Sequence, residues 1–97
     1  MEGQLSNLPY TPLIMTYPPK WTAEGNYLAR VFVFDHFVQA VEFINIITPL
    51  AEHMNHHPDL ELYSYNKLKI KISTHDAGNI ITQKDIDLAQ QINELIE

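Results

Sequence analysis

The chain contains no cysteine and only three glycines among its 97 residues. The missing cysteine excludes a disulfide framework, thiol catalysis and thiolate-bound zinc or iron–sulfur centres. Cations are also scarce, because six Lys+Arg stand against twelve Asp+Glu, which gives a formal net charge of −6. That balance argues against direct nucleic-acid binding through phosphate contacts.

Long apolar runs are missing as well, since no stretch reaches the roughly 18–20 residues of a membrane span. The first residues lack a basic segment followed by an apolar one, so no secretory signal is expected. We therefore predict a cytoplasmic protein without membrane contact. The length predicts one small domain whose core is thin enough for a partner subunit to help.

Prolines are concentrated at the start of the chain, where residues 1–20 hold four of the six: Pro9, Pro12, Pro18 and Pro19. Because proline fixes φ and lacks an N–H, this segment predicts an extended Pro/Tyr arm. The arm would lie over the domain or reach a neighbouring subunit. Residues 21–97 are predicted to form the single domain.

The first half of that domain predicts a hairpin followed by a helix. A short strand over 20–23, a turn at residues 24–26 and the β-branched and aromatic run 27–34 form the hairpin. Residues 36–54 change to helical spacing, and Pro49 predicts a kink or a restart there. The helix carries two apolar stripes: Phe37, Ala40, Val41, Ile44, Ile47 and, beyond the interruption at Thr48, Ala51 on one, and Phe43, Ile46 and Leu50 on the other.

The second half repeats the arrangement. Residues 61–65 and 67–74 predict a hairpin with a tight turn at Asn66-Lys67. Apolar residues alternate with lysines in its second strand, so one face is buried and one carries lysines. An anionic ligand on the lysine face is conceivable, but the acidic composition favours a solvated face. The buried residues would be Leu68, Ile70, Ile72 and Thr74, and the lysines are Lys67, Lys69 and Lys71.

The last helix has a clear start. Thr82 is a natural N-cap, Asp85 resembles the partner in a capping box, and Ile81 and Ile86 suit a hydrophobic staple. The residues predicted to be buried are Leu88, Ala89, Ile92, Leu95 and Ile96. The order β-β-α-β-β-α predicts an α+β fold with helices packed on one face of an antiparallel four-stranded sheet.

Histidines are the candidates for chemistry, and three of the five follow Glu52: His53, His56 and His57. His75 comes at the end of the lysine-faced strand, directly before Asp76. Imidazole titrates near neutral pH, so one ring can donate a proton while another accepts one. Glu52 lies four residues before His56 and could orient that ring. This pattern indicates general acid–base chemistry without a nucleophile.

Other interpretations stay open. His53 with His56 or His57 has helical chelate spacing, and His75 could complete a metal site. However, His56 and His57 point about 100° apart on a helix, which suits one ion poorly. The run His56-His57-Pro58 could simply end the helix, and Asp85 could serve only as a cap partner. His36 and His53 are interpreted as surface residues.

A resemblance strengthens the acid–base interpretation. The motif residues Glu52-x-x-x-His56-His57-Pro58, Tyr65-Asn66, Thr74-His75 and Asp85 resemble the signature of the pterin-4a-carbinolamine dehydratase family. In animals that family is also known as a dimerisation cofactor of a homeodomain transcription factor. The resemblance covers about residues 21–97 and implies the same α+β fold. It also implies dehydration of 4a-hydroxytetrahydrobiopterin to quinonoid dihydropterin, without metal or organic cofactor, in the recycling of tetrahydropterin for aromatic amino acid hydroxylases.

The resemblance also assigns residues. By motif position, the catalytic histidines would be His56, His57 and His75, with Glu52 and Asp85 as supporting carboxylates. The substrate-binding residues would be Asn55, His56, His57, Ser73, Thr74, His75 and Asp76. The chain departs from the family in its Pro/Tyr arm and in Leu60, where a Trp is common. It has one extra residue in each of two loops, 58–65 and 76–84, and Lys84 stands where some members have Arg.

Quaternary structure is predicted from the long helix. Its second apolar stripe, Phe43, Ile46 and Leu50, would face water in a monomer, so we expect a homodimer or a homotetramer. An alternative to the enzyme is a non-catalytic dimerisation or interaction module on the same scaffold.

Overall fold

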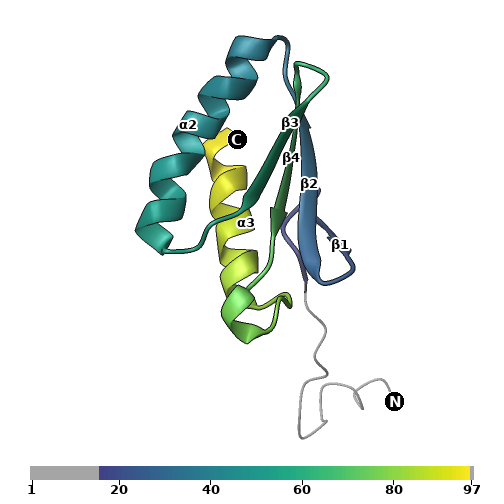
Figure 1. Ribbon diagram of the computed structural model, residues 1–97, viewed down its shortest axis with the longest axis vertical. Helices are drawn as coiled ribbons and strands as arrows, with labels where there is room; N and C mark the ends of the chain where they lie inside the picture. The colour runs from purple at the N-terminus through teal and green to yellow at the C-terminus, as the bar shows by residue number, and fades with distance from the viewer. Residues whose placement is uncertain (1–15, 97) are drawn as a thin grey trace, which may run out of the picture.

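Four strands form one antiparallel sheet in the order β1-β2-β4-β3 (Figure 1). This arrangement is seen in a computed structural model of the protein, which describes residues 16–96. The strands are β1 (Thr22–Glu24), β2 (Tyr27–Val33), β3 (Asp59–Tyr63) and β4 (Lys67–Ile72). The helices are α2 (Phe37–Met54) and α3 (Gln83–Ile96), with the 3-10 turn η1 (His75–Ala77) between β4 and α3. Both helices cover the same face of the sheet, so the predicted α+β fold and element order are confirmed.

The central strand β4 shows the predicted alternation. Leu68, Ile70 and Ile72 are fully buried beneath the helices. On the opposite face, Lys69 pairs with Glu24 at 3.0 Å, and the hydrogen bond it donates raises the pKa of Lys69. The other lysines of this face also have neighbours: Lys67 donates to Asn66 and Lys71 stands over the ring of Tyr27. These contacts support the interpretation of a solvated lysine face.

The face of α2 that packs on the sheet agrees with the prediction at Ala40, Ile47 and Ala51 and differs from it at two phenylalanines. Phe43 belongs to the core, with its ring centroid 5.2 Å from Phe32 and 5.4 Å from Phe34. Phe37, predicted to pack, is 50% exposed. The buried residues of the helix are Ala40, Phe43, Ile47 and Ala51. The expectation that Phe43 faces water was wrong, because the buried stripe lies between the two stripes read from the sequence.

The predicted restart at Pro49 does not occur, since α2 continues through it to Met54 (Figure 1). Proline removes the N–H that would bind the carbonyl of Asn45, four residues earlier. Both Pro49 and Asn45 are exposed, so water can satisfy that carbonyl. The preceding Thr48 hydroxyl donates to the carbonyl of Ile44 at 2.8 Å, which adds a local bond at this turn.

Two predicted boundaries were also wrong. Ser64 and Tyr65 have left-handed φ values of 47° and 53°, so the second hairpin turns over residues 64–66, and Lys67 already belongs to β4 rather than to the turn. Asn66 instead ties this hairpin to the end of β2, where its side-chain amide donates to the carbonyl of Phe34 at 3.0 Å. At the first hairpin, the left-handed Lys20 lies in a turn, so β1 begins two residues later than predicted.

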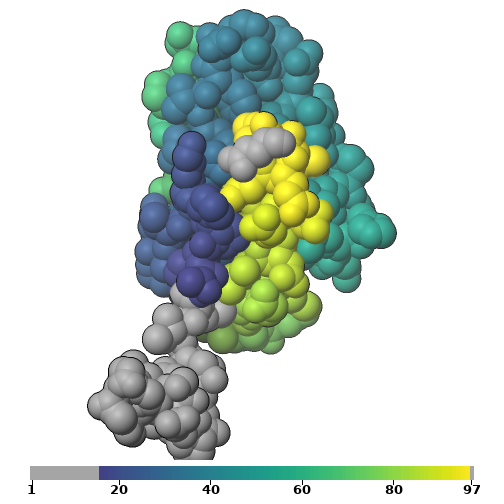
Figure 2. Space-filling view, turned by 180° about the vertical axis from the view of Figure 1, so that it is seen from behind, coloured from purple at the N-terminus to yellow at the C-terminus, as the bar shows by residue number. Residues whose placement is uncertain are grey.

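The segment before β1 is fastened to α3. Asn93 is buried on α3, accepts a hydrogen bond from the Trp21 indole at 2.8 Å and donates to the carbonyl of Pro19 at 3.1 Å. Figure 2 shows this N-terminal segment lying beside α3. Most of the predicted arm, residues 1–15, lies outside the described residues. Within residues 16–96 we find no helix with the length and apolarity needed to cross a membrane.

The core face of α3 is shorter than predicted. Leu88, Ala89 and Ile92 are fully buried, as expected, but Leu95 and Ile96 are each 42% exposed. The prediction of burial was wrong for these two because the last turn of the helix lies beside a groove between β2 and α2.

Candidate active site

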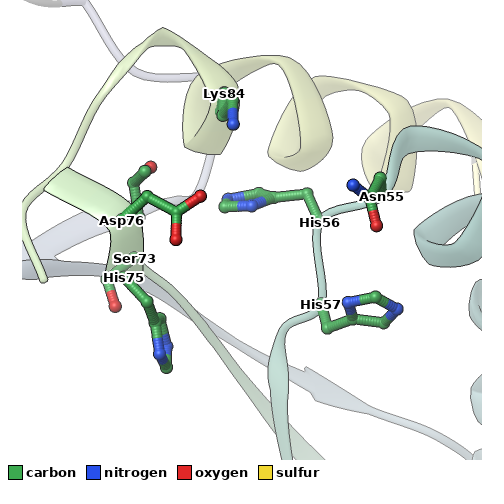
Figure 3. A pocket seen from close by; sticks show the side chains of 8 residues that line it. Asn55, His56, His57, Ser73, His75, Asp76 and Lys84 are labelled. Carbon is green, nitrogen blue, oxygen red and sulfur yellow. The ribbon is translucent and has the colours of Figure 1, made fainter.

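A cavity of about 230 Å³ opens where the end of α2, the end of β4 and the start of α3 meet (Figure 3). Its lining residues are Asn55, His56, His57, Ser73, Thr74, His75, Asp76 and Lys84. All seven residues predicted to bind substrate are among them. Glu52 and Asp85 are not in the wall but hydrogen-bond to two of the lining histidines. The sequence analysis did not place Lys84 in the site.

The end of α2 determines how its histidines enter the cavity. Asn55 adopts a left-handed conformation (φ 52°), which asparagine tolerates and which ends the helix. Two carbonyls of the last turn accept hydrogen bonds from beyond the helix, since His56 N–H donates to Ala51 at 3.1 Å and Asn55 N–H donates to Glu52 at 3.2 Å. His56 and His57 therefore project from a loop, and the predicted helical angle between them does not apply.

His56 is held by a buried carboxylate. Its Nε2 lies 2.6 Å from Oδ1 of Asp85, and the two side chains are 10% and 0% exposed. The second oxygen of Asp85 accepts from the Thr82 backbone N–H at 2.7 Å and from the Thr74 hydroxyl at 2.9 Å. The hydroxyls of Thr74 and Thr82 are themselves 2.6 Å apart. Asp85 thus combines the two roles considered from the sequence, because it caps α3 and also contacts a candidate catalytic ring.

His57 forms a second pair, with Glu52 rather than with a residue of α3. Its Nε2 lies 2.6 Å from the Glu52 carboxylate, and the side chains are 58% and 69% exposed. The expected pairing of Glu52 with His56 was wrong, because the left-handed turn at Asn55 breaks the i,i+4 geometry on which it depended. In Figure 3 the ring of His57 turns away from His75 and Asp76. A pair this exposed contributes little to stability.

The opposite wall comes from the loop after β4. Thr74 anchors the loop, since its N–H donates to Ile80 at 2.9 Å and its carbonyl accepts from Asn79 at 3.0 Å. His75 and Asp76 begin this loop, and in Figure 3 the Asp76 carboxylate points toward the ring of His56. The extra residue noted from the sequence does not displace Asp85, which still reaches both Thr74 and His56.

The metal interpretation finds no support in the geometry. Within residues 16–96, no three His, Asp or Glu side chains are grouped closely enough to hold a metal ion. His53 is exposed on α2, as expected. His36 is also exposed, and in addition its Nδ1 accepts the Gln39 N–H at 3.4 Å as the N-cap of α2.

Fold and site together define an α+β domain with a polar cavity walled by histidines, two of them paired with carboxylates. The family Pterin 4 alpha carbinolamine dehydratase matches residues 5–95, starting inside the predicted arm. The chain therefore belongs to the pterin-4a-carbinolamine dehydratase family. A "Putative pterin-4-alpha-carbinolamine dehydratase" of Sulfurisphaera tokodaii is 46% identical over 76 residues, which cover 78% of this chain and 80% of that protein. One of the same name from Picosynechococcus sp. is 44% identical over 77 residues, or 79% and 82% of the two chains.

Two solved structures share the fold. A transcriptional coactivator/pterin dehydratase from Brucella melitensis superposes with a TM-score of 0.73 and 28% identity, over 81% of this chain and 84% of that one. A pterin dehydratase-like protein described as a RuBisCO assembly factor in the alpha-carboxysome gives 0.60 and 17%, over 77% and 84%. At 17% identity, the resemblance to the assembly factor extends to the fold alone. Proteins that share this fold are thus described in different functional terms.

Proposed function

We propose that this protein dehydrates 4a-hydroxytetrahydrobiopterin to quinonoid dihydropterin by histidine acid–base catalysis and so recycles tetrahydropterin. The observation that carries the proposal is the pair of His56 with the buried Asp85, which presents an imidazole to a cavity that His75 also lines. An imidazole held by a buried carboxylate has a fixed orientation, which efficient proton transfer requires. The cavity volume of about 230 Å³ is below the usual range of small-molecule sites, so it would admit only a compact ligand.

The reaction requires two proton transfers. The C4a–O bond breaks as a proton is delivered to the leaving hydroxyl, which departs as water. The N5–H proton is removed, and a C4a=N5 double bond forms. Because Nε2 of His56 faces Asp85, its Nδ1 is the nitrogen left for the substrate. We assign the two transfers to His56 and His75, and a binding role to His57, whose ring is turned outward.

The first test is the dehydration assay itself. The wild-type protein should accelerate dehydration of freshly generated 4a-hydroxytetrahydropterin over the spontaneous rate. His75→Ala should lose at least about ten-fold of that acceleration, because acid–base groups typically contribute 10²–10⁴-fold. The matched control is His53→Ala, which removes an exposed imidazole outside the cavity and should keep wild-type turnover. A folded wild-type protein that does not change the spontaneous rate would overturn the proposal.

A second candidate role is that of an interaction module, and a groove at the other end of the molecule favours it. The groove has a volume of about 370 Å³ and lies between β2, α2 and the end of α3. It is lined by Val33, Phe34, Gln39, Glu42, Phe43, Ile46, Leu95 and Ile96. Ile46 is 50% exposed there, and Phe37 and Val38 are exposed at the start of the same helix. We propose that this surface joins copies of the chain into a dimer or a tetramer.

Light scattering coupled to size exclusion tests the assembly. The wild-type protein should elute as a dimer or tetramer at micromolar concentration, and Ile46→Glu should shift it toward monomer because a charge would enter the apolar contact. Val31→Glu places the same charge at an exposed residue of β2 that does not line the groove, and it should leave the assembly intact. A monomeric wild-type protein would contradict the proposal. If Val31→Glu dissociated the assembly and Ile46→Glu did not, the interface would lie outside the groove.

A further inference from the structure

Among the lining residues that have no role in the chemistry above, Lys84 is the lysine. Lys84 lies in the first turn of α3, next to Asp85, and its side chain belongs to the cavity wall. Figure 3 shows it on the helix beside the space that the His56 ring and the Asp76 carboxylate also face. Its backbone is fixed by the cap, because its N–H donates to the Thr82 hydroxyl at 3.3 Å.

A lysine at this position is electrostatically unfavourable for the fold. The N-terminal turn of a helix carries a partial positive charge, which favours acidic residues and disfavours cations. Within the described residues, no carboxylate lies within ion-pair distance of the Lys84 ammonium to offset this cost. Residues that break a local rule of this kind occur preferentially at functional sites.

The chemistry of the cavity indicates what Lys84 would contact. When ionised, the carboxylates at the site accept hydrogen bonds but cannot donate them, whereas an ammonium group donates hydrogen bonds but cannot accept them. A pterin offers one strong hydrogen-bond acceptor close to the reacting centre, the carbonyl oxygen on C4. The atom C4 is bonded directly to C4a, where the reaction takes place. A donor at that oxygen would hold C4a near the imidazole of His56. We propose that Lys84 binds the C4 carbonyl oxygen of the pterin and thereby orients the substrate, an inference that rests on the proposed dehydratase function.

The expected effect is on binding rather than on the chemical step. Breaking the C4a–O bond places no negative charge on the C4 oxygen, so the contact is about equally strong before and during the reaction. An interaction of that kind changes KM and leaves kcat nearly unchanged. Loss of a partly exposed, charge-assisted hydrogen bond should weaken binding about ten-fold. Lys84 is therefore a positioning residue in this proposal.

The experiment measures equilibrium binding of two non-reacting ligands to the full chain. The first is 7,8-dihydropterin, and the second is the matching 2-amino-7,8-dihydropteridine without the C4 oxygen. Lys84→Met should raise the dissociation constant of the first ligand about ten-fold and that of the second less than two-fold. Lys84→Arg should restore most of the loss, since it keeps a charged donor. Lys71→Met, which removes a lysine from the opposite face of the sheet, should bind both ligands like the wild type.

The outcomes separate the two proposals. Equal affinity of wild type and Lys84→Met for 7,8-dihydropterin would overturn the role of Lys84 and leave the dehydratase proposal standing. A wild-type protein that binds neither ligand would overturn both. In the dehydration assay, a loss of kcat in Lys84→Met with unchanged KM would also contradict a positioning role. Folding should not obscure the result, because Lys84 is exposed and opposes the helix dipole, and Lys84→Gln provides a second neutral variant.

Discussion

His56→Ala should lower kcat for pterin-4a-carbinolamine dehydration by about 10²–10⁴-fold, the usual contribution of a positioned acid–base group. His56 is the candidate catalytic ring with the most restricted surroundings, since its side chain is 10% exposed and its Nε2 is engaged by Asp85 at 2.6 Å. His57, the next residue along the chain, is not placed to take over this role, because its ring faces Glu52. Steady-state kinetics on freshly generated substrate measure the loss.

The alanine variant also leaves the Asp85 carboxylate without one of its partners, so a second variant is needed. His56→Gln retains an N–H donor in place of the ring but cannot exchange a proton near neutral pH. It should therefore preserve the fold and still lose most of the turnover. Wild-type kcat in a folded His56→Gln protein would show that His56 does not transfer a proton. His53→Ala, on the exposed side of α2, again serves as the matched control.

Asp85→Ala should have the largest effect on stability, lowering the free energy of unfolding by about 2–4 kcal/mol. The change removes the acceptor for three groups at once: the Thr82 N–H, the Thr74 hydroxyl and the His56 ring. Losing an N-cap interaction alone typically costs about 1 kcal/mol. The two remaining donors lie in partly or fully buried surroundings, where unmet hydrogen bonds are costly. Urea denaturation measures the effect as a lower midpoint at an unchanged m-value.

The control for this variant lies two residues further along the same helix. Asp87 is exposed, and among residues 16–96 the one group that donates to its carboxylate is the Gln83 side chain, at 2.9 Å. Asp87→Ala should cost no more than about 0.5 kcal/mol, as is usual for exposed pairs. If Asp85→Ala and Asp87→Ala destabilised the protein equally, the buried network around Asp85 would not contribute as described. Asp85→Ala should also lower turnover, because His56 loses the group that orients it.

The sequence was sufficient to predict the structure wherever a local residue pattern determines a single helix or strand. The alternation in β4 and the Thr82–Asp85 cap of α3 depend on near neighbours, and both are present in the structure. The buried face of α2 was predicted only in part, because two apolar stripes compete on one helix. Only the position of the sheet decides that Phe43 is covered and Phe37 is not.

In the candidate site, too, some features could be predicted from the sequence and others depend on the fold. The family resemblance identified residues that the fold does bring to one cavity, although they come from separate segments of the chain. The pairing of carboxylates with histidines could not be predicted, because it depends on where α2 ends. One left-handed residue, Asn55, directs His56 toward α3 and leaves Glu52 to His57. Lys84 was noted only as a substitution within a motif, and its place in the cavity wall required the fold.

The double use of Asp85 has a consequence for judging activity within this family. Selection for folding alone would retain this aspartate, since it closes the first turn of α3 whether or not a reaction takes place in the cavity. A relative that had lost catalysis could therefore keep Asp85, Thr74 and Thr82 unchanged. His75 makes no comparable contribution to packing, because it is exposed at the start of a loop. In a relative that had lost catalytic activity but kept the fold, we therefore expect His75 to be substituted before Asp85.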